Sequence, residues 1–487
     1  MYSNNPTHLS KIVVILDTSK QRQWQLALVE RLKAAGYEVG IATATAATSK
    51  TAALDRVLQL EGRRFGSSLA SFVAPRQPSP LELPDLVIDL AGSFAPGGTP
   101  VLRVQFNHHA DFASGMAQML AHKTLPLVTT HLNEDPVGVA RPMLSDRLWL
   151  SRIADEVLAG ALALIEQSVA RFAHGALRPI EPIAAGQVAS GFWRHYLPSF
   201  AGNIAQRAQK KLTTKRPFYW QVAYRQRPQT ALNTSDLPPE PPFTVLPDDG
   251  ERFYADPFVI EHQGKTWLFV EEYPYSKAKG VISVAEQKPD GTFDTPHMVL
   301  EEPYHLSYPQ VFKHGEDIFM LPESGGARRL VLYRATSFPD SWAVDTVLLS
   351  GVDINDATLL ERDGGFWLFG TERRSGAGSA SDTMVVFHAP SMGGPWTPHK
   401  LNPIAIDRSA ARPGGAFIEK DGRAFLPVQD GQHAYGGALG LMELLQLDHD
   451  MVVFAPPVPI GTGAAWDRVG IHTLNRAGSV EVVDSAG

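Results

Sequence analysis

The chain has 487 residues, of which 44% are hydrophobic and 20% charged, and its formal net charge is −7. A chain of this length and composition is typical of a folded protein with two or three domains. The negative net charge argues against a nucleic acid polymer as the main partner. The sequence contains no cysteine, which excludes disulfides, thiolate metal ligands and cysteine nucleophiles.

Targeting and metal-binding signals are also missing from the sequence. The first ten residues are polar, and the apolar run that follows them spans only residues 12–16. A membrane-spanning helix needs about 20 apolar residues, and a signal peptide also needs a longer run. The 16 histidines form no HExxH or similar ligand spacing. We therefore expect a cytoplasmic protein without a bound metal.

The first half of the chain predicts an α/β domain over residues 1–175. The β-branched run 11–16 is typical of a buried parallel strand, and apolar residues then follow at helical spacing in 21–35. Four more short strands and one long amphipathic helix are predicted at 38–42, 86–90, 101–106, 127–132 and 150–172. Strands that alternate with helices favour a mostly parallel sheet.

Residues 176–244 are predicted to form a helical and proline-rich linker. The segment 204–216 lies on a predicted helix and carries a basic run, made of Arg207, Lys210, Lys211, Lys215 and Arg216. Such a run suits a peripheral contact with an anionic membrane or a phosphorylated ligand, but equally a solvated helix surface. The proline-rich stretch 228–247 predicts extended chain.

The second half of the chain repeats a two-strand unit about every fifty residues. Each copy has a short strand, a glycine-containing turn and a second strand that is rich in apolar residues. The copies open at Asp256, Tyr308, Asp356, Arg412 and His472, so the steps are 52, 48, 56 and 60 residues. A period of this size predicts an all-β, five-bladed β-propeller over residues 245–487.

The position of the opening residue in each unit has a consequence for function. The opening residues are predicted to lie on the innermost strands, so that their five side chains converge on one axial pocket. Residues 243–246 are expected to pair with the last blade and close the ring, which would remove the free sheet edges.

Several motifs carry a resemblance to known families, namely the stretches 254–258, 305–309, 320–324, 395–399, 411–415 and 429–430. On these stretches the propeller resembles the family found as the N-terminal part of the plant glucosamine inositolphosphorylceramide transferase. That family is similar to the five-bladed sugar hydrolases of the fructosidase and arabinosidase type. The first domain resembles the formyltransferase fold, and the whole chain resembles bacterial proteins that pair the two domains.

The resemblance implies catalytic carboxylates in the propeller. It implies that Asp256 acts as base or nucleophile, and that Asp356 orients the sugar and tunes the acid. Glycoside chemistry needs two carboxyls across the scissile bond, one protonated and one ionised. The fourth unit opens with Arg412 and not with the expected glutamate, so Glu323 is the best candidate proton donor. Turn capping and simple solvation are the structural alternatives for these acids.

Further residues are predicted to bind substrate in the same pocket. They are His305, Tyr308, Arg412, Asp430 and His472. A cation, two imidazoles and a phenol suit a sugar that bears a phosphate or a carboxylate, because arginine binds such groups through two hydrogen bonds. For each histidine a structural role is an equal alternative.

The first domain offers an alternative site. The formyltransferase resemblance implies an oxyanion-stabilising pair at Asn107 and His109, with Asp135 orienting the histidine. The proline-rich loop that normally follows the histidine is replaced here by residues 110–112. A folate would be the formyl donor. It is the one cofactor implied by the hypotheses considered for this sequence, and only by the formyltransferase one.

Three functions follow from these patterns. The leading hypothesis is a carbohydrate-active enzyme, a sugar transferase in bacterial surface glycan or glycolipid assembly, that binds a sugar or nucleotide sugar in the propeller. The second is a formyltransferase that acts on an amino-sugar nucleotide. The third is a non-catalytic glycan-binding module.

Overall fold

The computed structural model describes residues 9–45, 52–66, 68–92, 97–184, 192–213, 219–226, 237–374, 378–433, 435–461, 463–468 and 470–486. The chain divides into two compact units. The first comprises Met1–Thr214 with Ser375–Ser379, and the second comprises Lys215–Arg374 with Ala380–Gly487.

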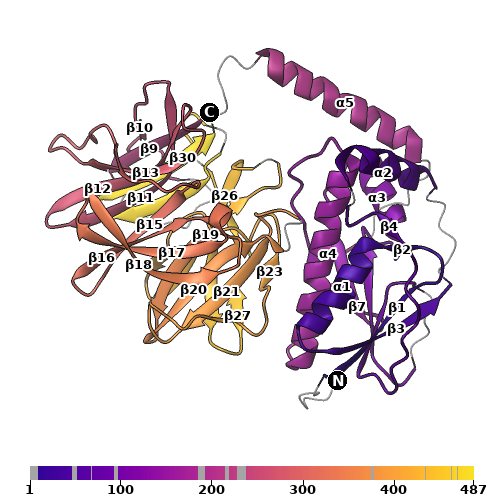
Figure 1. Ribbon diagram of the computed structural model, residues 1–487. Helices are drawn as coiled ribbons and strands as arrows, with labels where there is room; N and C mark the ends of the chain where they lie inside the picture. The colour runs from indigo at the N-terminus through magenta and orange to yellow at the C-terminus, as the bar shows by residue number, and fades with distance from the viewer. Residues whose placement is uncertain are drawn as a thin grey trace. The chain divides into compact units, whose positions relative to one another are not determined.

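The first unit is built on a six-stranded mixed sheet with strand order β3-β1-β5-β6-β7-β8 (Figure 1). The strands are β1 (Lys11–Asp17), β3 (Glu38–Ala44), β5 (Leu86–Asp89), β6 (Val101–Phe106), β7 (Val128–Leu132) and β8 (Asp135–Ala140). Strands β3, β1, β5 and β6 run parallel, while β7 and β8 are antiparallel to their neighbours. The α/β prediction therefore holds for the first four strands, and β8 is an additional strand.

The described residues of the same unit form five helices. They are α1 (Gln23–Ala34), α2 (Ala52–Phe65), α3 (Phe112–His122), α4 (Leu150–Ala173) and α5 (Phe192–Thr213). Helix α1 begins two residues later than predicted, because residues 21–22 form a short strand, β2 (Gln21–Arg22), with β4 (Phe72–Val73). The buried carboxylate of Glu61 accepts the backbone N–H groups of Leu150 and Ser151 at 3.2 and 2.7 Å, which caps α4. None of the described helices is long and apolar enough to cross a membrane.

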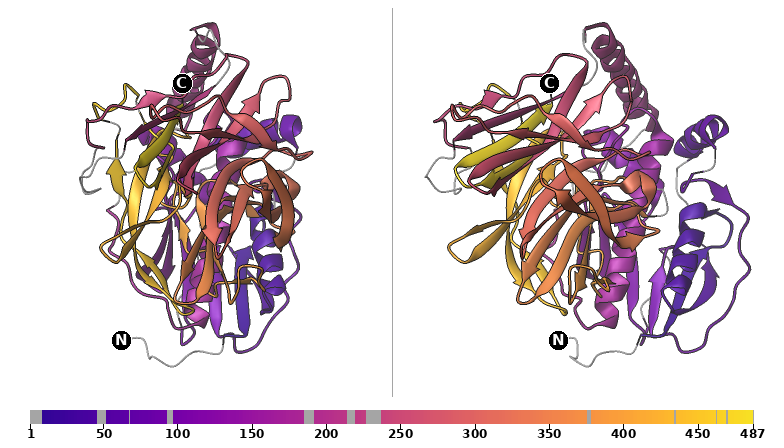
Figure 2. Two further views of the ribbon diagram at one scale, coloured as in Figure 1. Left: turned by 90° about the vertical axis from the view of Figure 1, so that its left-hand side faces the viewer. Right: turned by 60° about the vertical axis from the view of Figure 1, so that its left-hand side comes forward.

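The second unit contains five sheets, each built on a four-stranded path, that form the five blades of a β-propeller (Figures 1 and 2). Blade one holds β11 (Arg252–His262), β12 (Lys265–Pro274), β13 (Val281–Glu286) and β14 (His297–Leu300), and blade two holds β15 (Ser307–His314), β16 (Asp317–Glu323), β17 (Arg329–Ser337) and β18 (Ser341–Ser350). A short 3-10 helix, η1 (Gly325–Ala327), lies between β16 and β17. The predicted repeat is confirmed in both blades.

The remaining blades have the same strand order, but Arg412 and His472, expected on innermost strands, precede the first strands of blades four and five. Blade three holds β19 (Ile354–Arg362), β20 (Gly365–Glu372), β21 (Thr383–Ala389) and β22 (Thr397–Pro398), with β23 (Ala405–Ile406) beside β21. Blade four holds β24 (Ile418–Lys420), β25 (Arg423–Asp430), β26 (Ala438–Leu447) and β27 (Val452–Phe454), with β28 (Val458–Ile460) beside β26. Blade five holds β29 (Thr473–Ala477), β30 (Val480–Ala486), β9 (Trp220–Gln226) and β10 (Thr244–Val245).

Blade five closes the ring with segments from both ends of the propeller. Figure 1 shows β9 beside β30, and the two strands pair antiparallel over seven residues each. The region 176–244, expected to be a linker, therefore supplies a blade strand. The predicted pairing of residues 243–246 occurs through β10, which is bonded to β9 at the outer edge of the sheet. Of the basic run, Lys215 and Arg216 lie outside the described residues.

Apolar clusters fill the spaces between neighbouring blades. One cluster includes Phe269 of blade one and Met320 of blade two, both fully buried. Another includes Leu321 of blade two and Leu368 of blade three. Each blade therefore packs apolar side chains against its neighbours.

A buried ion pair joins the two strands that close the ring, which gives a first prediction. Arg225 on β9 contacts Glu481 on β30 at 2.6 Å, and neither side chain is exposed. The Arg225 guanidinium also donates to the carbonyls of Pro238 and Pro241 at 2.6 and 3.0 Å. Replacing Arg225 with methionine should lower the free energy of unfolding by about 1–3 kcal/mol, because the carbonyls of Pro238 and Pro241 lose their donor and Glu481 keeps only Arg476 as a cationic partner.

Urea unfolding followed by tryptophan fluorescence measures this loss. Arg423→Met is the matched control, because Arg423 pairs with Glu443 on a solvent-exposed face and should leave the transition in place. A wild-type transition for Arg225→Met would show that this pair does not hold the ring closed.

Candidate functional site at the propeller axis

The backbone of three blades adopts a left-handed conformation at the residue that opens the repeat. The φ angles are 48° at Asp256, 45° at Tyr308 and 49° at Asp356. Each lies in a β-bulge, where the register between the first and second strands of the blade shifts. For a residue with a side chain this conformation costs roughly 1–2 kcal/mol, so compensating contacts are required.

The compensating contacts come from a second set of polar residues that the repeat places on the second strand of each blade. One lies toward the end of the second strand of each blade: Glu271, Glu323, Thr371, Gln429 and Asp484. Two of these carboxylates accept a backbone N–H of the next blade. Asp484 accepts from Asp256 at 2.9 Å, and Glu323 accepts from Asp356 at 3.1 Å. We call these five residues the second-strand ring.

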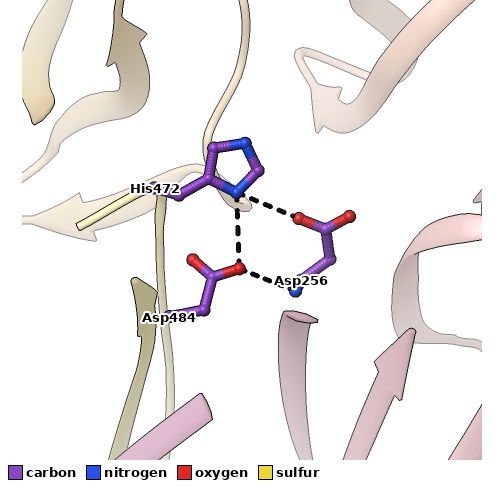
Figure 3. Close-up of side chains that lie close together, drawn as sticks. All are labelled: Asp256, His472 and Asp484. Atoms are coloured by element: carbon purple, nitrogen blue, oxygen red, sulfur yellow. Dashed lines mark hydrogen bonds and ion pairs between the residues drawn. The ribbon is translucent and has the colours of Figure 1, made fainter. Parts of the chain in front are cut away.

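The first charged cluster at the axis consists of Asp256, His472 and Asp484 (Figure 3). His472 Nδ1 lies 3.3 Å from Asp256 Oδ1 and 3.3 Å from Asp484 Oδ2. Asp484 also accepts the backbone N–H and the hydroxyl of Thr473 at 2.7 and 2.8 Å. Asp256 Oδ2 accepts the backbone N–H of Tyr308 at 3.2 Å, so blades five, one and two meet here.

Charge sets the protonation of this cluster. Burial alone would lower the pKa of His472, but the two neighbouring carboxylates outweigh it and raise the pKa to about 10. The imidazole is therefore protonated at neutral pH. Burial raises the pKa of Asp256, while His472 opposes the rise.

The same three side chains have the residue types of a cation site, since their ligand atoms lie within 4.8 Å of one another. A protonated imidazole offers no lone pair to a metal at the nitrogen that carries the proton. A metal at this position would therefore have to displace the proton from Nδ1, the atom that faces both carboxylates.

The second charged cluster consists of Asp356, Arg412, Glu323 and Gln429. Arg412 donates to both oxygens of Asp356, from Nε at 2.6 Å and from Nη2 at 3.1 Å, and Gln429 donates to the same carboxylate. Arg412 Nη2 also lies 3.4 Å from Glu323 Oε2. Burial alone would raise the pKa of Asp356, but Arg412 lowers it, so Asp356 is ionised.

Two glutamates of the second-strand ring have the opposite tendency. Burial and the nearby Asp356 charge raise the pKa of Glu323 well above its ordinary value. Burial and the charges of Asp256 and Glu323 do the same for Glu271. His305 Nε2 lies 3.4 Å from Glu271, and its Nδ1 accepts the backbone N–H of Gly280, so the neutral ring presents Nε2–H to that carboxyl.

A half-exposed tyrosine lies above both clusters. Tyr435 is 44% exposed, and its ring lies 5.3 Å from the Arg412 guanidinium and 5.2 Å from the His472 ring. The ring of Trp220, on β9, lies 4.5 Å from the ring of His472. Sequence reasoning missed Tyr435 because it lies outside the repeat. A solvent-facing aromatic beside buried charges suits the stacking of a sugar ring.

The structure brings together most of the residues expected in the pocket, but two expectations change. Tyr308 is fully buried, and its hydroxyl contacts Thr358 at 2.9 Å and accepts the backbone N–H of Gly415 at 2.7 Å. It therefore joins blades two, three and four as a core residue. Asp430 accepts the backbone N–H of Gln432 in a local turn.

The alternative formyl site is not assembled. The amide of Asn107 is occupied, since it donates to Gly115 O and accepts from the backbone of Leu127. Asp135 pairs with Leu132, which lies opposite the start of β6, whereas Asn107 and His109 follow the end of that strand. About 13 Å of strand separates the two positions, so Asp135 is not placed to orient His109.

A crevice of about 290 Å³ does open in this unit, at the carboxyl ends of the parallel strands. It is lined by residues that include Asp17 at the end of β1, Gly92 after β5 and Asp111 before α3. None of the three residues expected to form the formyl site lines it.

Comparison with known proteins concerns the propeller. The family model "Glucosamine inositolphosphorylceramide transferase 1, N-terminal" matches residues 247–472, just under half of the chain. The Glucosamine inositolphosphorylceramide transferase 1 of Oryza sativa subsp. japonica is 34% identical over 227 residues, which are 46% of this chain and 30% of that protein. The Arabidopsis thaliana protein of the same name is 33% identical over 188 residues, 38% of this chain and 24% of that protein.

The chain thus spans about a third or less of the length of these relatives. The relatives are plant proteins, so they do not support the bacterial grouping, and neither they nor the family match support a formyltransferase-like first domain.

Solved structures with a similar arrangement include an exo-beta-1,3-galactanase from Clostridium thermocellum, with a TM-score of 0.36, 14% identity and coverage of 42% of this chain and 49% of that one. They also include an alpha-L-arabinanase from Cellvibrio cellulosa, with a TM-score of 0.33, 15% identity and coverage of 43% and 78%.

The Asp356–Arg412 pair gives a prediction that depends on pH. Arg412→Met leaves the Asp356 carboxylate buried without its cation, which should destabilise the protein by about 3–5 kcal/mol at neutral pH. The wild-type pair stabilises the fold above the unfolded pKa of an aspartate, near 3.9, and this contribution is lost as the pH falls through the lowered folded pKa.

The difference in unfolding free energy between wild type and Arg412→Met should therefore shrink as the pH falls toward 4, because Asp356 becomes protonated in the variant. Urea unfolding at several pH values measures it. The double variant Asp356→Asn, Arg412→Met should recover part of the loss at neutral pH, and a difference that does not change with pH would exclude this charge pair as its source.

Proposed function

We propose that the protein is a carbohydrate-active enzyme whose site is the axis of the propeller. The observation that supports this most strongly is the split in protonation among buried carboxyls at one axis. Asp356 has a lowered pKa, whereas Glu271 and Glu323 have strongly raised ones. Cleavage or formation of a glycosidic bond needs one carboxyl of each kind.

The roles follow from the contacts. Glu323 is the proton donor, because its neutral carboxyl can protonate the oxygen that leaves the anomeric carbon. Asp256 is the base, because burial strengthens its basicity and His472 holds its orientation. It takes the proton of the incoming hydroxyl as that oxygen bonds to the anomeric carbon. Asp356 stays ionised and positions Arg412 and Glu323.

The incoming hydroxyl distinguishes transfer from hydrolysis. The plant relatives are named transferases, and this supports a sugar acceptor over water. The matched segment is a minor part of those proteins, so their names alone do not assign transfer to the propeller. We propose a sugar transferase in glycan or glycolipid assembly, with the sugar ring stacked on Tyr435.

The test uses a panel of nitrophenyl glycosides and nucleotide sugars as donors. Asp256→Asn and Glu323→Gln should each lower kcat by about 100-fold or more while the protein stays folded, although Asp256→Asn also removes one of the two carboxylates paired with His472. Tyr435→Ala should mainly raise KM, because it removes binding surface and leaves the acid and base in place.

Glu372→Gln is the matched control. Glu372 follows Thr371 of the second-strand ring but pairs with Arg374 at 2.9 Å, outside both clusters. Ligand binding by wild type without turnover of any donor would favour a glycan-binding module. Full activity in Asp256→Asn would exclude the axial base.

A further inference from the structure

The segment that joins the two halves of the chain has an unusual charge. Residues 182–235 contain no aspartate or glutamate and eight lysines or arginines, in a chain whose net charge is −7. Helix α5 (Phe192–Thr213) occupies much of the described part of this segment. Its sequence includes four of the eight basic residues: Arg194, Arg207, Lys210 and Lys211.

One face of α5 packs against its own unit. Tyr196 is buried, and its ring stacks between Phe192 and Phe200 at 5.3 and 5.6 Å. Asn203 donates to the carbonyl of Arg147 at 2.7 Å. From Ile204 onward, every side chain of the helix that the structure describes is exposed.

A second face of α5 is apolar and exposed. Trp193 is 43% exposed, Leu197 55%, Ile204 45% and Leu212 85%. At 100° per residue these positions, with the exposed Ala201 and Ala208 between them, fall within an arc of about 100°. Their spacing therefore produces one continuous apolar stripe along nearly the whole helix, distinct from the packed face.

We infer that α5 is an interfacial helix that lies on an anionic lipid surface. The apolar stripe would enter the boundary between headgroups and acyl chains, with Trp193 at the depth that tryptophan favours. The basic residues and the absence of any acidic side chain in the helix complement the negative charge of anionic headgroups. The helix is too polar to cross the bilayer, so it lies in the plane of the interface.

The positive charge of α5 argues against other partners that could cover its apolar stripe. A second copy of α5 would bring two sets of basic residues together, and only Arg207 has a described acidic neighbour, Asp146 at 4.0 Å, so like charges would repel. An acidic protein surface would also complement the positive charge of α5. The vesicle experiment below separates this alternative, because the vesicles contain no protein partner. The inference concerns where the protein acts and does not depend on the reaction at the propeller axis.

Co-sedimentation of the full-length protein with vesicles tests the inference. We expect binding to vesicles that contain about one third phosphatidylserine, weak binding to pure phosphatidylcholine, and loss of binding at high salt. Leu197→Asn with Leu212→Asn should lower the fraction bound to anionic vesicles at least tenfold. The readout needs no turnover, so it fails or succeeds independently of the proposed enzyme activity.

The chain offers a closely matched control. Leu445 is 58% exposed on β26 and Leu83 is 88% exposed in the first unit, so Leu83→Asn with Leu445→Asn removes the same exposed area elsewhere. This control should bind like wild type. Equal binding by both double variants, or no binding of wild type to anionic vesicles, would overturn the inference. A dimer in solution that the α5 variant abolishes would instead assign the stripe to a second copy.

Discussion

The propeller depends on hydrogen bonds that run from the backbone of one blade to the carboxylates of the blade before it. The left-handed backbone at Asp256 and Asp356 turns their N–H groups toward Asp484 and Glu323. These hydrogen bonds offset the strain of the bulges. The carboxyl groups that join neighbouring blades are therefore also ionisable groups of the axial site.

This dual role explains the split protonation at the axis. Five carboxyls close together in a buried site do not all ionise, because like charges repel and water is excluded. Of the two cations, Arg412 pairs with Asp356, and His472 lies between Asp256 and Asp484. Glu271 and Glu323, which have weaker or no cationic contacts, are pushed toward the neutral form. The neutral glutamates and the aspartates paired with cations thus result from the same arrangement of charges at the axis.

The sequence predicted the propeller well because its period is carried by local patterns that the blades preserve. Asp256, Asp356, Arg412 and His472 were found because the repeat marks their positions. The same repeat contains the second-strand ring, and aligning Glu271, Gln429 and Asp484 would have revealed it. The fifth blade was harder to predict, since Arg225 and Glu481 are 256 residues apart.

Other features were not within reach of sequence patterns. Tyr308 has the residue type of a ligand-binding group, yet its burial depends on contacts with two other blades. The prediction of a formyl site was wrong because spacing along the chain does not reveal that β7 runs antiparallel to β6. This pairing places Asp135 at the opposite end of the sheet from Asn107 and His109. In both cases strand pairing decided the outcome.

The charge state of His472 tests the account of the axis most directly. Nuclear magnetic resonance of the protein with isotope-labelled histidine, assigned by comparison with His472→Asn, follows this imidazole through a pH titration. The account predicts that the ring stays protonated through neutral pH and loses its proton only near pH 10. A pKa at or below the ordinary value for histidine, about 6.5, would show that Asp256 and Asp484 do not form the charged cluster on which the proposed chemistry depends.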